Sequence, residues 1–329
     1  MENGHTVSIT GVGSFLPRKV LTNDDLTKML DTTDEWIIKR TGIKERRVVE
    51  NGATASDLAI EASLRALDDA NVLPSEVGLI IAATITPDCL VPSTACFIQE
   101  KIGAKNAGAF DLLAACSGFV YALSIAKSFI VSGAMKTVLI VGTECLSKIT
   151  DYTDRSTCIL FGDGAGAAVV QRDNGKKKIV TTYLGSDGSQ ADLLKLPAGG
   201  SKLPVSQATI ESRSHYIQLR GKELFKTAIN NMVDMITKVA TENNMQVEDF
   251  DMIIPHQSNI RIIEAAMERL KQPKKKAYVN IDKYGNTSAA SIPIAIDEID
   301  KEGLLSPGDS VLLVAFGGGL TWGTSLIKW

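Results

Sequence analysis

One of the chain's five cysteines lies where a nucleophile would be useful. Cys116 follows an apolar run at 107–113 and precedes a helical pattern that begins at Ser117. The run predicts a buried strand of a parallel sheet, because it is continuous and apolar. A helix N-terminus favours a thiolate, which is the nucleophilic form of cysteine. The structural alternative is a buried cysteine that acts as a small hydrophobe.

Few side chains are available to assist such a thiol, because the sequence has only three histidines. His256 follows three apolar residues at the predicted carboxyl end of a strand, where open α/β sheets bind ligands. His5 lies near the N-terminus, and His215 lies in a polar segment without a pattern. Asn286 is a second candidate, with a helix N-cap as its structural alternative. The Phe-Gly-Gly-Gly segment at 316–319 offers backbone N–H groups suited to an oxyanion hole.

A basic, aromatic segment at 32–47 could bind a nucleotide. Trp36 and Arg40 are four residues apart and therefore share one helix face. An indole beside guanidinium groups can stack on a nucleobase and pair with phosphates. The alternative is a tryptophan packed under a solvated basic face.

The elements that would position these residues are repeated along the chain. A predicted helix at 54–70 leads to an apolar strand at 77–84, and a helix at 221–240 leads to one at 252–255. Cys116 lies 17 residues before Gly133, and Asn286 lies 17 residues before Gly303. This parallel predicts an α/β protein of two duplicated halves, 1–172 with Cys116 and 173–329 with His256 and Asn286. Packed together, such halves make five layers, with the site at their junction.

Composition excludes several classes of protein. The 329 residues are 44% hydrophobic and 22% charged, which is typical of a globular chain with a large core. The net charge of −3 is too small to favour binding to nucleic acid or a membrane. No signal peptide or apolar run of transmembrane length is visible. The cysteines form no CxxC pair, which predicts free thiols in a reducing cytoplasm and no disulfide or metal site.

Two glycine-rich motifs invite a nucleotide-binding interpretation that their contexts disfavour. Gly11-x-Gly13 lacks the third glycine of a dinucleotide loop, and Leu16-Pro17 would break the helix that should follow. The segment 162–166 is followed by a β-like run, so it predicts tight packing or bulges instead of a phosphate loop.

Taken together, four motifs resemble β-ketoacyl-acyl-carrier-protein synthase III, the thiolase-fold family that starts dissociated fatty-acid synthesis. The motifs are AACSG at 114–118, PHQSN at 255–259, YGNTS at 284–288 and FGGG at 316–319. The resemblance covers essentially the whole chain, including the segment 34–43. It implies a thiolase-like fold with α-β-α-β-α layers.

The resemblance also implies roles for individual residues. Cys116 would accept the acyl group, His256 and Asn286 would form the decarboxylation pair, and the N–H groups of Cys116 and Gly318 would form the oxyanion hole. The coenzyme A and substrate contacts would be Thr32, Trp36, Arg40, Arg155, Gly221, Phe225, Asn259 and Phe316. The carrier-protein contacts would be Lys226, Gln257, Ser258, Asn259, Ile260 and Arg261.

The implied reaction is a decarboxylative Claisen condensation in the cytoplasm. A short acyl-CoA primer and malonyl-acyl carrier protein would give 3-oxoacyl-acyl carrier protein, CO₂ and CoA, with acyl-CoA as a substrate and with no cofactor. The enzyme would be a homodimer in which Val91 of one chain caps the acyl pocket of the other. Valine is smaller than phenylalanine, so branched four- and five-carbon primers are expected to be accepted at rates comparable with acetyl.

Departures from related families narrow the choice. Degradative thiolases use a second cysteine near the C-terminus as base, and here no cysteine follows Cys158. Elongating condensing enzymes use two histidines, and Asn286 occupies the position of the second. Cys-His-Asn condensing enzymes of polyketide or quinolone synthesis are the alternative. An inactive partner subunit is disfavoured because the nucleophile is present.

Overall fold

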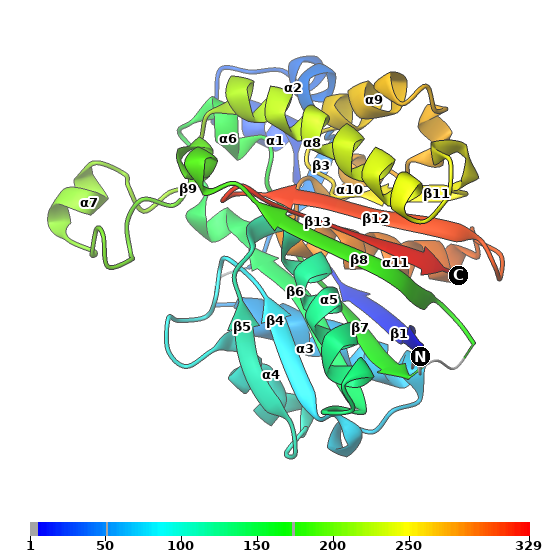
Figure 1. Cartoon of the computed structure of the whole chain (residues 1–329). Helices are drawn as coiled ribbons and strands as arrows, with labels where there is room; N and C mark the ends of the chain where they lie inside the picture. The colour runs from blue at the N-terminus through cyan, green and yellow to red at the C-terminus, as the bar shows by residue number, and fades with distance from the viewer. Residues whose placement is uncertain (1–5, 51, 173–174) are drawn as a thin grey trace.

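The first half of the chain forms a five-stranded sheet. The computed structural model describes residues 6–50, 52–172 and 175–329 (Figure 1). Strand β4 is parallel to both of its neighbours, whereas β7 is antiparallel to both of its own. In spatial order the strands are β5 (Gly108–Leu112), β4 (Leu79–Ala83), β6 (Thr137–Cys145), β7 (Asp163–Arg172) and β1 (Val7–Phe15).

The second half repeats this strand order. Ala277 pairs in parallel with Ile253 at the position that β5 occupies in the first half. The two sheets join at one residue pair, Ser8 with Lys178. The strands are β11 (Met252–Pro255), β12 (Ser310–Gly317), β13 (Thr321–Lys328) and β8 (Lys178–Ser186). The predicted boundary at 172/173 falls between β7 and β8, where residues 173–174 lie outside the described part of the chain, so the division stays a prediction.

Helices complete the five predicted layers (Figure 1). The helices α3 (Ala55–Ala70) and α4 (Thr94–Ile102) pack on the outer face of the first sheet. The helices α8 (Gly221–Glu242) and α9 (Ile260–Arg269) cover the outer face of the second. The helices α5 (Gly118–Val131) and α11 (Ser291–Glu302) lie between the sheets.

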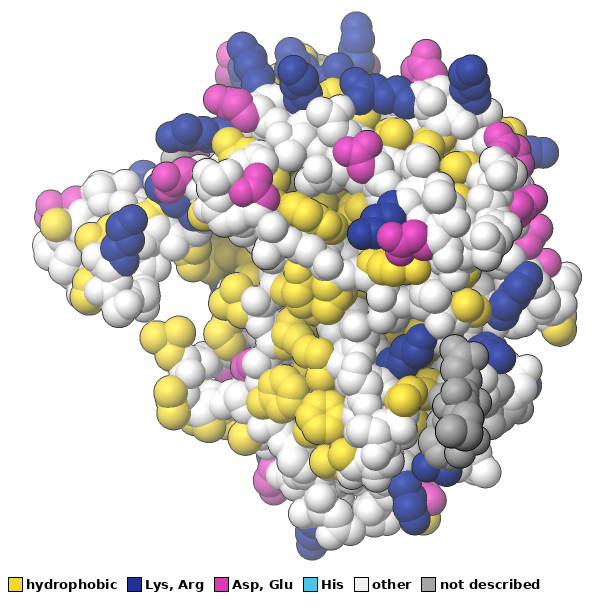
Figure 2. Space-filling model, viewed as in Figure 1, with side chains coloured by type: hydrophobic (Ala, Val, Ile, Leu, Met, Phe, Trp, Pro, Cys, Tyr) yellow, Lys and Arg dark blue, Asp and Glu magenta, His cyan; other side chains and the backbone are white. Residues whose placement is uncertain are grey.

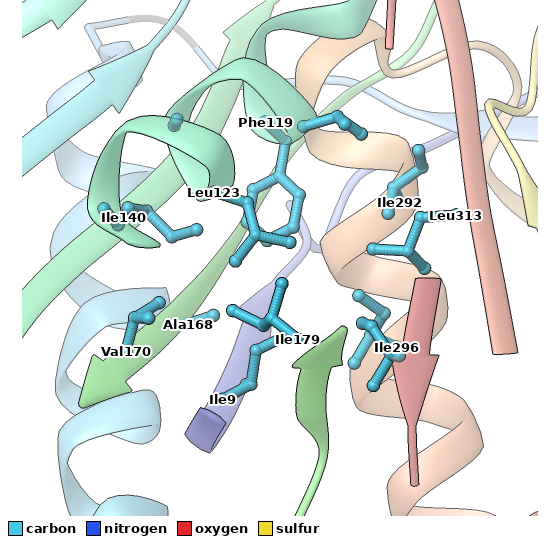
Figure 3. Packing of buried hydrophobic residues seen from close by; sticks show 14 of the residues in the cluster. Ile9, Phe119, Leu123, Ile140, Ala168, Val170, Ile179, Ile292, Ile296 and Leu313 are labelled. Carbon is cyan, nitrogen blue, oxygen red and sulfur yellow. The ribbon is translucent and has the colours of Figure 1, made fainter. Parts of the chain in front are cut away.

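The central layer is the apolar core on which the site is built. Phe119 and Leu123 of α5 face Ile292 and Ile296 of α11, and Leu313 of β12 closes the contact (Figure 3). All five side chains are buried. Each such burial stabilises the fold by about 1.5–3 kcal/mol, so both central helices are held firmly at the ends that carry the site.

Glycines let the strands approach α11 and α3 closely. A Cβ on Gly142 would lie 2.3 Å from the carbonyl oxygen of Ala289, and one on Gly166 would lie 2.7 Å from Cβ of Pro293. The tight packing predicted for 162–166 is therefore confirmed. A Cβ on Gly11 would lie 2.4 Å from the carbonyl oxygen of Ala66, so this glycine allows β1 to contact α3.

The prediction of a buried strand before Cys116 is wrong. β5 is the edge strand of the sheet, and it is half-buried or exposed along its length. Leu113, directly after it, is 80% exposed. An apolar run predicts that a strand is shielded from water. It does not show whether the shield is a helix of the same chain or a second molecule at the sheet edge.

The remaining helices and strands are short. They are β2 (Val20–Thr22), α1 (Asn23–Thr27), α2 (Asp34–Thr41), β3 (Glu45–Arg47), α6 (Arg155–Cys158), β9 (Leu194–Lys195), α7 (Gln207–Glu211), β10 (Gln218–Leu219) and α10 (Ile281–Tyr284). The segment with α7 stands away from the body as an arm (Figure 1). At its base, Arg213 Nε donates to Asp151 Oδ2 at 2.6 Å. Within the described residues, no helix has the length and hydropathy needed to cross a membrane.

Candidate active site

Cys116 lies in the 3₁₀ turn Ala115–Ser117, directly before α5. The turn is tight, with a positive φ of 47° at Ala115. Burial raises the pKa of the Cys116 thiol to about 12, against the lowering effect of the nearby Ser288 hydroxyl. This shift favours the neutral thiol, against the thiolate expected from the helix start. Desolvation is the largest cause of this shift.

His256 directly follows β11, and its backbone N–H donates to Val314 at 2.8 Å. The side chain is buried, and its Nδ1 lies 2.7 Å from the Ser291 hydroxyl. The ring of Phe316 meets the imidazole edge-on, with 6.0 Å between centroids. Burial lowers the pKa of His256 to about 3, so the imidazole is neutral at pH 7.

Asn286 lies between α10 and the 3₁₀ turn Ser288–Ala290 that opens α11. Its Oδ1 accepts the N–H of Ser288 at 2.8 Å, which leaves the Nδ2 amide to face the cavity. The interpretation of Asn286 as a cap is thus partly right, because its oxygen satisfies an N–H at the start of a turn. The same contact fixes the side chain as a hydrogen-bond donor toward a ligand.

A buried carboxylate lies close to Cys116 and Ser288. Glu144, at the end of β6, accepts hydrogen bonds from Thr86 Oγ1 at 2.8 Å and from the N–H of Ile85 at 3.2 Å. Burial raises its pKa to about 7, and the nearby Ser288 hydroxyl lowers it. Ser288 Oγ has no partner of ordinary geometry in the described part of the chain, but it is close enough to influence both Glu144 and Cys116.

The Phe-Gly-Gly-Gly segment passes directly behind the nucleophile. A Cβ on Gly317 would lie 2.6 Å from the backbone nitrogen of Cys116. A Cβ on Gly318 would lie 3.2 Å from the carbonyl oxygen of Leu194. Glycine is therefore required at 317 by contact with Cys116, whereas the oxyanion-hole role of Gly318 stays a prediction.

One cavity of about 870 Å³ connects these residues to the surface. Cys116, His256, Asn286 and Ser288 line its inner part. Ordinary small-molecule sites have volumes of roughly 300–1,000 Å³, so the cavity is large enough for an extended ligand. No group of three or more potential metal ligands occurs among residues 6–50, 52–172 and 175–329.

The outer end of the cavity contains the predicted nucleotide-binding residues. The guanidinium carbons of Arg40 and Arg155 lie 5.0 Å and 4.8 Å from the ring of Trp36. Arg155 is held there by a hydrogen bond of 2.7 Å to the carbonyl of Asp31. In the part of the chain that is described, the lining includes Trp36 and Arg40 but not Thr32 or Arg155. Other predicted contacts in the lining are Gly221, Phe225, Asn259 and Phe316.

The six predicted carrier-protein residues separate into three groups by exposure. Arg261 and Lys226 are exposed, and Arg261 lies over the ring of Phe225 at 5.3 Å. Gln257 is buried, and its amide bonds the carbonyl of Pro255 at 2.8 Å and the N–H of Asn280 at 3.0 Å. The prediction that Gln257 faces a carrier protein is therefore wrong for its side chain, which braces the interior.

The other three predicted surface residues are only partly exposed. Ser258 lines the cavity, and its hydroxyl has no partner among the described residues. Asn259 caps α9 by accepting the N–H of Arg261 at 2.9 Å, and its Nδ2 donates to the carbonyl of Arg40 at 3.1 Å. Ile260 packs against Gly42, where a Cβ would lie 2.5 Å from its side chain. These contacts join α9 to α2 at the cavity mouth.

Comparison with known proteins identifies the family. Residues 110–188 match the 3-oxoacyl-[acyl-carrier-protein (ACP)] synthase III family, and residues 240–329 match its C-terminal family. The chain is 54% identical to β-ketoacyl-[acyl-carrier-protein] synthase III of Caldanaerobacter subterraneus subsp. tengcongensis, over 98% of this chain and 97% of the relative. The chain belongs to the β-ketoacyl-[acyl-carrier-protein] synthase III family.

Solved structures of synthase III agree with this assignment. The crystal structure of 3-oxoacyl-[acyl-carrier-protein] synthase III from Aquifex aeolicus is 49% identical, with a TM-score of 0.90 over 98% of this chain and 100% of that one. The priming β-ketosynthase of the R1128 polyketide pathway is also similar, at 35% identity and a TM-score of 0.89 over 98% of this chain and 95% of that one. The predicted fold and family are confirmed.

Three residues of this synthase III site were not predicted from the sequence. Ser291 contacts His256, and the N–H of Ser288 contacts Asn286. Glu144 lies close to Ser288 and Cys116. Ser288 and Ser291 belong to the serine-rich segment after Asn286, so their proximity to that residue was visible. The contact between Ser291 and His256 spans 35 positions, and nothing in the local sequence indicates it.

Proposed function

We propose that the chain catalyses the condensation of a short acyl-CoA primer with malonyl-acyl carrier protein, giving 3-oxoacyl-acyl carrier protein, CO₂ and CoA. The single observation that carries this proposal is that Cys116, His256 and Asn286 line one cavity. Each has the chemical type that one step needs. A thiolate is both a strong nucleophile and a fair leaving group, and two neutral donors can hold an enolate.

In the first half-reaction, Cys116 takes the primer. Its sulfur attacks the thioester carbonyl, and the carbon–sulfur bond to CoA breaks. The proton lost by the Cys116 thiol passes to the departing CoA thiolate, which gives CoA-SH. The tetrahedral oxyanion would accept N–H groups from Cys116 and Gly318. A resting thiol with a raised pKa is protected from side reactions.

In the second half-reaction, malonyl thioester loses CO₂ and the resulting enolate attacks the acyl-cysteine. The carbon–carbon bond forms as the bond between Cys116 sulfur and the acyl carbon breaks, which regenerates the thiol after proton uptake. Asn286 Nδ2 and the free ring nitrogen of His256 would hold the enolate oxygen. A preorganised donor of this kind is worth about 3–4 kcal/mol in the transition state.

The two substrates would bind to different groups of residues at the cavity mouth. Trp36 with Arg40 and Arg155 supports binding of the adenine and phosphate end of CoA. Lys and Arg side chains gather over α2, α8 and α9 (Figure 2), which supports docking of an acidic carrier protein near Arg261 and Lys226. We include a cytoplasmic location in the proposal, in keeping with the unpaired cysteines.

We also propose that the enzyme is a homodimer. The edge strand β5 leaves backbone groups unpaired, and apolar side chains flank it on this face (Figure 2). Leu90 and Val91 are 81% and 85% exposed on the loop after β4. Apolar side chains beside an open sheet edge favour pairing with a second copy. Val91 would then enter the partner's acyl pocket.

A primer panel tests the proposed reaction. Acetyl-, isobutyryl- and isovaleryl-CoA are each supplied with malonyl-acyl carrier protein, and the products are measured by mass. We expect branched primers to react at rates comparable with acetyl, because Val91 leaves more room than phenylalanine. Cys116→Ala should abolish acylation in every case. A tenfold or greater rejection of isobutyryl would overturn the primer assignment, and absence of all products would overturn the reaction.

A further inference from the structure

The tautomer of His256 can be worked out from its surroundings. The imidazole is buried, and its Nδ1 is engaged with Ser291 Oγ at 2.7 Å. The other ring nitrogen, Nε2, is therefore the one available to a ligand in the cavity. In a neutral imidazole one nitrogen donates a hydrogen bond and the other accepts one. If Ser291 Oγ carries the proton of its contact with Nδ1, then Nε2 is the donor. If Nδ1 carries that proton, then Nε2 is the acceptor.

The hydrogen bonds of Ser291 indicate where that proton lies. Its hydroxyl oxygen accepts the backbone N–H of Gln257 at 3.4 Å. Among the described residues, Nδ1 of His256 is the one acceptor within hydrogen-bonding distance of this hydroxyl. Ser291 is itself buried, so leaving this proton without an acceptor would cost free energy. The arrangement that satisfies every group has Ser291 donating to Nδ1.

We propose that Ser291 is a positioning residue that holds His256 in the Nε2–H tautomer, so that the imidazole donates a hydrogen bond to the reacting thioester oxygen. This inference deepens the proposed function and rests on it. The hydroxyl belongs to the first residue of α11, whose central packing fixes its location. Ser288 holds Asn286 in a comparable way through its N–H, so two serines of one segment orient the two donors.

The decisive experiment is ¹⁵N NMR of the imidazole in full-length protein labelled at histidine. The chain has three histidines, so a His5→Gln/His215→Gln background leaves His256 as the one signal. We expect a pyrrole-type shift for Nε2 and a pyridine-type shift for Nδ1 in this otherwise unchanged protein. A pyrrole-type Nδ1 would overturn the proposal. This measurement does not depend on activity, so its outcome is separable from that of the proposed function.

Kinetics of Ser291 variants give the second test. Ser291→Ala should shift signal toward the Nδ1–H tautomer and lower condensation at least about tenfold, because a wrong tautomer disables a catalytic histidine. Loading of Cys116, followed by intact-protein mass, should remain within about twofold. Ser291→Thr keeps the hydroxyl and should recover the wild-type shifts and most of the rate. Condensation at the wild-type rate in Ser291→Ala would contradict the proposed role.

Discussion

At the level of single residues, Asn286 can be tested separately from Cys116. Its Nδ2 faces the cavity because Oδ1 is occupied by Ser288. Asn286→Ala removes one donor from a charge that develops only during decarboxylation. We expect condensation to fall roughly 10²–10³-fold, the usual cost of one oxyanion donor, with loading within about tenfold of wild type. Failure of a folded variant to load the acyl group would instead make Asn286 a partner of the thiol.

Glu144 makes stability depend on pH in a direction unusual for a carboxylate. Its pKa is raised from 4.5 to about 7 by burial, so the folded state binds its proton more tightly than the unfolded chain does. The stability that this proton contributes is complete below about pH 4.5 and is lost as pH rises through 7. We predict that Glu144→Gln removes this dependence.

Urea unfolding of wild type and Glu144→Gln between pH 5 and pH 8 measures the difference. The variant's advantage in unfolding free energy should grow up to about pH 7 and then level off. Glu61→Gln, at an exposed position of α3, is the matched control. A constant difference across this range would mean that Glu144 titrates normally in the folded protein.

At the level of elements, the close contact between β6 and the start of α11 leaves no room for a side chain at Gly142. Gly142→Ala would bring a Cβ to 2.3 Å from the carbonyl of Ala289, so the turn that follows Asn286 must move. We expect a loss of about 1–3 kcal/mol in unfolding free energy and a larger proportional loss in condensation than in loading. Gly188→Ala is the control, because nothing lies within 4 Å of its added Cβ. Equal behaviour of both variants would show that the turn can adapt.

The sequence predicted the layers and the three central residues because both depend on local signals. Apolar periodicity indicates α5, the equal spacing of Cys116 and Asn286 from a later glycine indicates α11, and the motifs around Cys116, His256 and Asn286 are contiguous. It did not predict the exposure of β5 or the burial of Gln257. The first depends on which strand is outermost, and the second depends on Asn280, which is distant along the chain.

The thiolate expectation failed for a similar reason. A helix start is visible in the sequence, but the burial around it is made by other segments. Gly317 contacts the backbone of Cys116, and Ser288 approaches its sulfur from the second half. Desolvation by residues from both halves therefore decides the pKa of the thiol, and no local pattern reports it.

At the level of the whole molecule, charge around the cavity mouth should control the encounter with a carrier protein. Arg261→Glu should raise KM for malonyl-acyl carrier protein and leave acyl-CoA loading nearly unchanged, because surface charges act mainly on association. Lys136→Glu makes the same charge change at an exposed site after α5 and is the control. Turnover should also fall with added salt, since exposed charges are screened beyond roughly 8–10 Å.

Steady-state kinetics with carrier protein, beside single-turnover loading, separate the outcomes. An equal loss in both assays for Arg261→Glu would indicate a defect in the stacked pair with Phe225 instead of in docking. An equal effect of Lys136→Glu would show that only total charge matters.

The position of β13 has a consequence for biosynthesis. This strand is the last in sequence order, but it lies between β12 and β8 in space. Until residues 321–328 have left the ribosome and inserted, β8 has an open edge and α5 lacks part of its cover. The nascent chain therefore exposes an unpaired strand edge and apolar surface until that strand inserts. Chaperone binding should be strongest just before this point, and a premature stop codon there would remove a central strand and release an aggregation-prone product.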